Sequence, residues 1–337
     1  MKVKINDRFY YSFDAITINY KLDSVASAFS IKARFNPDSE FHKEIFKPLQ
    51  YQKVELFDNN DDLKLTGIIL NTALASASVR ELQTISGYSK SGIIEDVNIP
   101  FSAYPLEKNN VSLNDVVRNV LSPFNINYSI SADVLNDMNL NYARTTASPT
   151  ESIKGFLSKL AAQRNIILSH DASGDLLFTR PNVNATPKYL LTDQNTLSMS
   201  LAVNGQAMHS QIDVIRQPSK NNSGVSTVDT ASNNLVNANR PIVKILTSGT
   251  DTDTKKAADN LLSAELRGIT LSVALNNVIS VNCGDIVEVI NKEVYIYDRT
   301  RFMVSEISHS ESVTGDNMIL TLVLPETFSG GSPTIIF

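Results

Sequence analysis

Apolar and polar side chains alternate with a period of two through the first hundred residues, and this pattern constrains the fold more than any other feature. The alternation covers residues 15–20, 28–35 and 51–57, and further β-rich runs follow at 63–75 and 80–88. A period of two places every second side chain on one face, as in a half-buried β-strand. Residues 58–62 have the composition of a turn. Five or more short strands joined by tight turns predict an antiparallel barrel or sandwich.

The pattern changes near residue 100, where helical spacing begins. The run from Ser112 to Asp115 has the form of a capping box, and apolar residues at 113, 116, 117, 120 and 121 follow on one helical face. Ser148-Pro149-Thr150-Glu151 predicts the start of a second helix, with apolar residues at 153, 156, 157, 160 and 161. A hairpin with its turn at 171–175 follows. Residues 100–187 are therefore predicted to form an α+β module.

Strand patterns return after residue 196. Asn204-Gly205 between apolar runs at 197–203 and 206–216 predicts a hairpin turn. Residues 218–240 contain few bulky apolar side chains, which predicts a long exposed loop, and residues 252–267 predict a third helix. The predicted organisation is mainly β: a first tube-like antiparallel β-barrel domain (1–99), the α+β module (100–187), and a second β-barrel domain (188–337) with the loop and the helix inserted.

Composition limits the possible partners. The chain has 337 residues, 42% hydrophobic, which suffices for two or three domain cores. Charged residues make up 19%, the net charge is -5, and no Lys/Arg cluster occurs, so no specific nucleic-acid binding is expected. The sequence contains no apolar run of about 18 residues and no leader pattern. We therefore expect folding in a cytoplasm without a membrane anchor.

Candidate metal, cofactor and nucleophile positions lack the spacing that their chemistry needs. The single cysteine, Cys283, cannot form an internal disulfide and is predicted to be a buried small residue. No phosphate-binding glycine motif occurs. The histidines stand far apart in sequence without a paired ligand; they are His42, His170, His209 and His309. We expect no metal site and no cofactor.

Acid pairs matter because a cell-wall hydrolase uses two carboxylates that flank the scissile bond. Three groups are candidates by position: Glu95 with Asp96; Asp58 with Asp61 and Asp62; and Asp298 with Glu306. The acids at 58–62 stand among asparagines, where such side chains commonly bond the backbone of a turn. The chain has no Trp and few aromatic residues near these acids, although sugar sites stack rings on aromatic side chains. We therefore predict no catalytic residue.

Several stretches, in this order, resemble the Mu-type phage baseplate hub family. Residues 54–57 leading to Thr66-Gly67-Ile68-Ile69 resemble the family's strand and turn with the pattern "D-G-x-I". Residues 85–96 (ISGYSKSGIIED) resemble its "G-R-S-K-x-x-D-L-V-D" stretch, with Tyr88 in place of Arg. Residues 119–126, 161–168, 173–180 (SGDLLFTR), 282–289 and 315–328 resemble further family elements. The departures are Cys283 in place of a proline and the Asn/Ser-rich segment 218–240.

The resemblance implies a function that composition alone does not. The family is similar in fold to the hub of T-even phages and to the hub part of type VI secretion spikes. It implies a non-enzymatic virion protein of a contractile tail baseplate, assembled in the bacterial host cytoplasm. Three copies would form a ring of six barrels that adapts a hexameric tail tube to a trimeric central spike. The implied partners are further copies of the chain, the tail tube protein, the central spike protein and other baseplate proteins.

Two other functions remain open from the residues. A β-rich chain rich in Asn and Ser is also typical of a carbohydrate- or receptor-binding tail module, for which an exposed aromatic patch would be the sign. A tail-associated cell-wall hydrolase is the second alternative, and it would need an acidic pocket.

Overall fold

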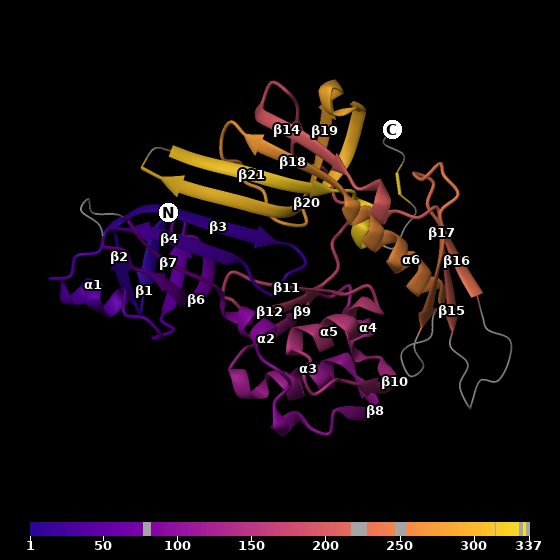
Figure 1. The fold of residues 1–337 in the computed structure, drawn as a ribbon, viewed down its shortest axis with the longest axis horizontal. Coiled ribbons are helices and arrows are strands. Elements are labelled where there is room, and N and C mark those ends of the chain that lie inside the picture. Colours follow the sequence, from indigo (N-terminus) through magenta and orange to yellow (C-terminus); the bar gives the residue numbers. More distant parts are fainter. Residues whose placement is uncertain (77–81, 217–227, 247–253, 314, 330–332, 335–337) are drawn as a thin grey trace.

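The computed structural model describes residues 1–76, 82–216, 228–246, 254–313, 315–329 and 333–334. It confirms a mainly β chain with an α+β insert (Figure 1). The first β unit holds the predicted alternating runs. Its elements are β1 (Lys2–Ile5), β2 (Arg8–Tyr10), β3 (Phe13–Lys21), β4 (Ala28–Ala33), α1 (Glu40–Ile45), β5 (Lys53–Phe57), β6 (Leu63–Ala73) and β7 (Gln83–Ser89).

The α+β module follows and packs its helices on a core of its own. Its strands are β8 (Glu107–Ser112), β9 (Tyr128–Ile130), β10 (Asn141–Thr146), β11 (Ile167–His170) and β12 (Leu176–Thr179). Its helices are η1 (Lys90–Gly92), α2 (Ile93–Asp96), η2 (Phe101–Ala103), α3 (Leu113–Leu121), η3 (Ser122–Phe124), α4 (Leu135–Asn139) and α5 (Ile153–Ala162). The predicted apolar faces of α3 and α5 are fully buried in this core. The capping box is confirmed, since Ser112 Oγ accepts from Asp115 N at 3.1 Å.

The second β unit contains the longest strand. Its strands are β13 (Leu190–Leu191), β14 (Thr196–Val203), β15 (Gln211–Arg216), β16 (Val228–Ser232), β17 (Pro241–Leu246), β18 (Ile269–Leu275), β19 (Ile286–Asn291), β20 (Ile296–Ser312) and β21 (Gly315–Val323). Its helices are η4 (Gly205–Ala207), α6 (Thr254–Glu265), η5 (Leu266–Gly268), η6 (Lys292–Val294) and η7 (Pro325–Phe328). The predicted third helix is therefore present over the described part of residues 252–267.

The two β units share one sheet. Its order is β14-β18-β21-β20-β3-β4-β7-β6-β5-β1-β2, with β13 and β19 branching from β20. The join is the antiparallel pair β3–β20, in which Thr17 lies opposite Ser310. In Figure 1 the yellow strands β20 and β21 lie directly beside the indigo strand β3. A separate sheet, β16-β15-β17, packs against α6 at one end of the molecule.

Two local predictions, a hairpin and a helix start, are corrected. The hairpin at Asn204-Gly205 is wrong: β14 pairs with β18 along its length, and β15 belongs to the separate sheet. The burial of Met208 in the core beside β18 draws the chain away from β14. The second helix begins at Ile153 rather than Pro149, because a bridge to Asn98 holds Ser152 extended and Ser152 Oγ caps Gly155 N at 3.1 Å.

The exposed loop predicted for residues 218–240 is wrong for its second half. Residues 228–232 form β16, which pairs with β15, and Ala231 is buried against α6. Leu235 and Val236 pack against the core of the second β unit. Few bulky residues are needed here because the neighbouring strand and helix supply most of the apolar surface. Residues 218–227 lie outside the described residues.

Candidate functional site

The predicted acid pairs are separate structural contacts. Glu95 and Asp96 lie in α2, where Glu95 forms an ion pair with Lys154 and Asp96 accepts a 2.6 Å hydrogen bond from Tyr88 Oη. Asp298 and Glu306 stand eight residues apart on the same strand, which spans up to about 26 Å when fully extended. Glu306 pairs with Lys21 at 3.0 Å. Neither set places two carboxylates on opposite sides of one bond.

The acids at 58–62 form the turn between β5 and β6, as predicted. Asp58 Oδ1 accepts from the backbone N–H groups of Asn60 at 2.8 Å and Asp62 at 2.9 Å. The ion pair with Lys64, at 2.9 Å, lowers the pKa of Asp58, and the backbone hydrogen bonds add to this effect. Asp61 pairs with Lys2 at 2.6 Å. These contacts fix the turn.

Two of the four histidines and the cysteine line the same cleft, and the other two histidines lie elsewhere. His42 lies in α1 and His209 Nδ1 contacts Glu265 at 2.7 Å, whereas His170, His309 and Cys283 line one cleft. Within the described ranges, no three metal-ligating side chains come together. Cys283 is half-buried, and this burial raises the pKa of its thiol to about 12. A thiol that stays protonated at neutral pH is a poor nucleophile.

The cleft, of about 880 Å³, lies where the two β units and the module meet. The first β unit contributes Tyr20 and residues of the 58–64 turn, and the module contributes the β11–β12 hairpin. The second β unit contributes residues 278–285 and side chains of β20 and β21, among them Ile307, His309 and Met318. His170 sits on the hairpin side of this cleft. Its Nε2 lies 2.8 Å from Ser27 Oγ and its Nδ1 lies 3.1 Å from the Asp171 carbonyl. A neutral ring that donates from Nδ1 and accepts at Nε2 satisfies both contacts.

We expect stability to fall as the pH drops below about 6.5, the unperturbed histidine pKa. Burial lowers the pKa of both His170 and His309 in the folded protein. The unfolded chain therefore binds protons first, and the free energy of unfolding decreases as pH falls from the unfolded toward the folded pKa. Urea titrations at pH 7.5 and 5.0 measure this loss. His170→Gln should make the loss smaller, and an unchanged pH dependence would contradict the assignment.

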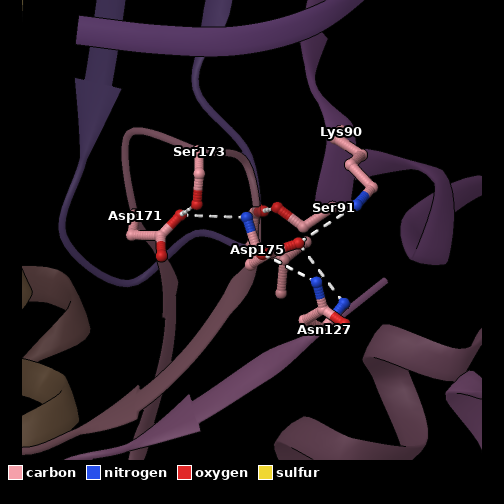
Figure 2. Close-up of polar contacts among 7 residues, drawn as sticks. Lys90, Ser91, Asn127, Asp171, Ser173 and Asp175 are labelled. Atoms are coloured by element: carbon pink, nitrogen blue, oxygen red, sulfur yellow. Dashed lines mark hydrogen bonds and ion pairs between the residues drawn. The ribbon is translucent and has the colours of Figure 1, made fainter. Parts of the chain in front are cut away.

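A polar joint ties the hairpin turn to η1, which directly follows β7 of the first β unit (Figure 2). Lys90 Nζ lies 3.1 Å from Asp175 Oδ1, and Asn127 donates to the same carboxylate from its backbone N at 3.3 Å and its Nδ2 at 3.2 Å. These bonds help to keep the pKa of Asp175 low despite its burial, which acts in the opposite direction. Asp171 Oδ1 accepts from Asp175 N at 3.0 Å and Ser173 Oγ at 2.6 Å, and so closes the turn.

Gly174, at the tip of this turn, allows the close approach. Its φ is +77°, and a Cβ at this position would lie 2.5 Å from the Thr66 carbonyl oxygen and 2.8 Å from Lys90 Cβ. Only glycine fits both the left-handed backbone and the contact. The joint brings together stretches that carry the family resemblance: 66–69, 85–96 and 173–180. Sequence reasoning gave no joint role to Lys90, Asn127 or Asp175. Lys90 lies in the 85–96 stretch, Asp175 ends the predicted turn, and Asn127 directly follows the 119–126 stretch.

A row of small uncharged side chains crosses the solvent face of the shared sheet. One row runs across six neighbouring strands, from β21 through β20, β3, β4 and β7 to β6; it is Asn317, Ser310, Thr17, Ser30, Ser86 and Asn71. Thr17 Oγ1 and Ser310 Oγ are hydrogen-bonded at 3.0 Å across the join between the β units. The intervening residues of these strands, such as Ile16, Ile18 and Ile85, point into the core. We call this row the polar row; its sequence signal was the polar half of the alternation.

Comparisons with known proteins agree with this architecture. Residues 101–180 match the model of the second domain of gp44-like baseplate hub proteins. The 43 kDa tail protein of prophage MuSo2 from Shewanella oneidensis shares the fold with a TM-score of 0.78 at 18% identity, covering 97% of this chain and 98% of that one. The tail protein of Neisseria meningitidis MC58 gives 0.79 at 16% identity, covering 98% and 97%.

A more distant structure is the Escherichia coli c3393 protein, described as a type VI secretion component with structural similarity to T4 tail proteins gp27 and gp5. It gives a TM-score of 0.58 at 10% identity, covering 100% of this chain and 80% of that one. The search of curated proteins found no match. Residues 101–180 are therefore similar to the second domain of gp44-like baseplate hub proteins, within a chain whose fold is shared with these tail proteins over nearly its whole length.

Proposed function

We propose that the chain is a structural hub protein of a contractile phage tail baseplate or a related injection machine. The match of residues 101–180 to the gp44-like hub family carries the proposal, and the tail-protein fold of the whole chain supports it. In this proposal three copies form a ring that adapts a hexameric tube to a trimeric spike. Its partners are the tube protein, the spike protein and other baseplate proteins, and it is located in the virion tail after assembly in the host cytoplasm.

The shared sheet supports a ring of this kind. Each chain supplies two β units that are already joined in register by β3 and β20. Three chains therefore supply six β units, and threefold and sixfold partners can meet on the same ring. The path of the sheet ends at β14 on one side and β2 on the other, so among the described strands each end has an unpaired edge that can contact another copy.

The polar row suits the wall of a central passage. Serine, threonine and asparagine side chains form weak, exchangeable hydrogen bonds, and the row contains no charge that would hold a passing polyanion. We assign this face of the sheet to the inside of the ring. The opposite face of the sheet is occupied by the cores of the two β units.

The test is the mass and shape of the purified protein. Three chains of 37.1 kDa predict a particle of about 111 kDa by light scattering. Class averages from negative-stain electron microscopy should show a threefold ring with a central hole. A monomer at tens of micromolar, with no ring in the images, would remove the proposal.

We propose a structural and not a catalytic role, because four of the candidate acids, Asp58, Glu95, Asp96 and Glu306, are each engaged in separate turn, helix or strand contacts. No helix within the described ranges has the length and apolar character to span a membrane. One observation favours the carbohydrate-binding alternative: Phe9 and Tyr11 stack with their ring centroids 6.0 Å apart on the surface. Retention of the protein on host glycans, lost with Tyr11→Ala, would favour that function.

A further inference from the structure

The small sheet at one end of the molecule carries apolar side chains on both faces. On the α6 side, Ile212, Val214 and Ala231 are buried against the helix. On the other side, Ile215 lies opposite Val228 in β16 and Ile245 in β17. Val243 extends this group along β17. We call Ile215, Val228, Val243 and Ile245 the aliphatic patch.

The aliphatic patch is exposed within the single chain. Val228, Val243 and Ile245 are 53%, 55% and 66% exposed. A sheet that has one face covered by a helix ordinarily presents polar side chains on the other face. A row of β-branched side chains in contact with water indicates that a partner covers the second face.

A second apolar surface lies at the opposite end of the molecule. Phe9 and Tyr11 are 44% and 72% exposed, and the Phe9 ring also contacts Phe57 at 6.3 Å between centroids. We call Phe9, Tyr11 and Phe57 the aromatic patch. It lies at β2, the last strand of the shared sheet, whereas the aliphatic patch lies on β15, β16 and β17 at the other end of the long axis (Figure 1).

We propose that the aliphatic patch of one copy packs against the aromatic patch of the next copy around the ring. This inference rests on the proposed ring and names the surfaces that form it. Two unlike surfaces at opposite ends of one chain join copies head to tail, and head-to-tail contacts produce a closed ring when the rotation between copies closes. Aromatic rings against β-branched side chains are also a favourable pairing in β structures.

Charged side chains border both patches. Asp213 shares the face of the aliphatic patch, opposite Val243, and its carboxylate accepts from Thr230 at 2.6 Å and Gln211 at 2.9 Å. It forms no ion pair with any residue of the described ranges. On the aromatic side, Lys2 and Lys4 lie in register opposite Phe57 and Phe9, and acids of the same unit pair with both: Asp61 with Lys2, and Glu55 and Asp7 with Lys4. The contact between the patches therefore rests on their apolar side chains, with charged groups at the rim.

The test places a charge in each patch. Ile245→Lys and Tyr11→Lys should each raise the dissociation constant of the trimer about 30-fold or more, since each buries a charge in an apolar contact. Val313→Lys is the matched control, because Val313 is 82% exposed at the β20–β21 turn and belongs to neither patch. Sedimentation velocity measures assembly, and thermal melts confirm that each subunit remains folded. Combining Ile245→Lys with Tyr11→Glu should restore part of the trimer.

The outcomes separate this inference from the ring itself. A wild-type trimer that survives both lysine variants overturns the assigned surfaces and leaves the ring intact. Wild-type dimers that only Ile245→Lys dissociates indicate a twofold contact between aliphatic patches and also overturn it. If the wild-type protein is a monomer, both the proposed ring and this inference are wrong. Loss of trimer in both variants, with the control unchanged, supports the inference.

Discussion

Gly174→Ala is expected to lower the free energy of unfolding by about 2–4 kcal/mol, a large effect for one methyl group. The added Cβ would lie 2.5 Å from the Thr66 carbonyl oxygen, and the backbone would have to keep a φ of +77°. The strain falls on the joint between the hairpin turn and the first β unit. Urea denaturation measures the stability change, and limited proteolysis of the β11–β12 hairpin measures local loosening.

Gly205→Ala is the matched control for this prediction. A Cβ at Gly205 would meet no atom within 4 Å, and the backbone there is not left-handed. This variant should stay within about 0.5 kcal/mol of the wild type. If Gly174→Ala is equally mild, the turn does not press against Thr66 and Lys90 as described. If Gly205→Ala destabilises the protein as much as Gly174→Ala does, the close contacts of Gly174 are not the cause of the stability loss.

Arg164→Ala is expected to cost about 3–4 kcal/mol, because it empties a buried site in the core and leaves two carbonyl groups at the end of α4 without their charged donor. Arg164 is only 6% exposed, and its Nη1 donates to the carbonyls of Asp137 at 2.5 Å and Leu140 at 2.7 Å. The guanidinium also lies 3.6 Å from the centre of the Tyr142 ring. One side chain therefore closes the end of α4 and fills the core beside α5.

Arg144 provides the comparison within the same module. It is half-exposed and pairs with Glu107 at 2.6 Å on the surface. Arg144→Ala should change stability by less than about 1 kcal/mol, since exposed ion pairs contribute little. Arg164→Lys should recover only part of the loss, because an ammonium group cannot reproduce the planar contact with Tyr142. Equal effects of Arg164→Ala and Arg144→Ala in urea denaturation would refute the role given to Arg164.

Sequence alone predicted the parts of the fold that depend on local spacing. The apolar positions of α3 and α5 and the alternation of β3, β4 and β5 each require only a helical or strand period, and all lie in the cores. The hairpin at Asn204-Gly205 failed because turn propensity competes with the longer pairing of β14 to β18. Local composition could not decide between the two.

The candidate site was less accessible to sequence reasoning. Lys90 and Asp175 are 85 residues apart and meet only after the module has folded. The polar row and the two patches likewise depend on which strands become neighbours. An exposed valine such as Val228 reads as an ordinary loop residue until β15 and β17 are placed beside it. These features depend on the order of the strands in the sheets. That order is determined by the whole chain and cannot be predicted from a single segment.

The pairing of β3 with β20 also sets a constraint on synthesis. Thr17 and Ser310 are separated by 293 positions. At about 5–20 residues per second, roughly 15–60 s pass between translation of the two strands. Throughout that interval the edge of β3 has no partner from its own chain, although β4 and β7 are already available on the other side. The nascent chain therefore carries an open strand edge until its last fifty residues emerge, and its assembly into a particle has to wait for the C-terminal strands.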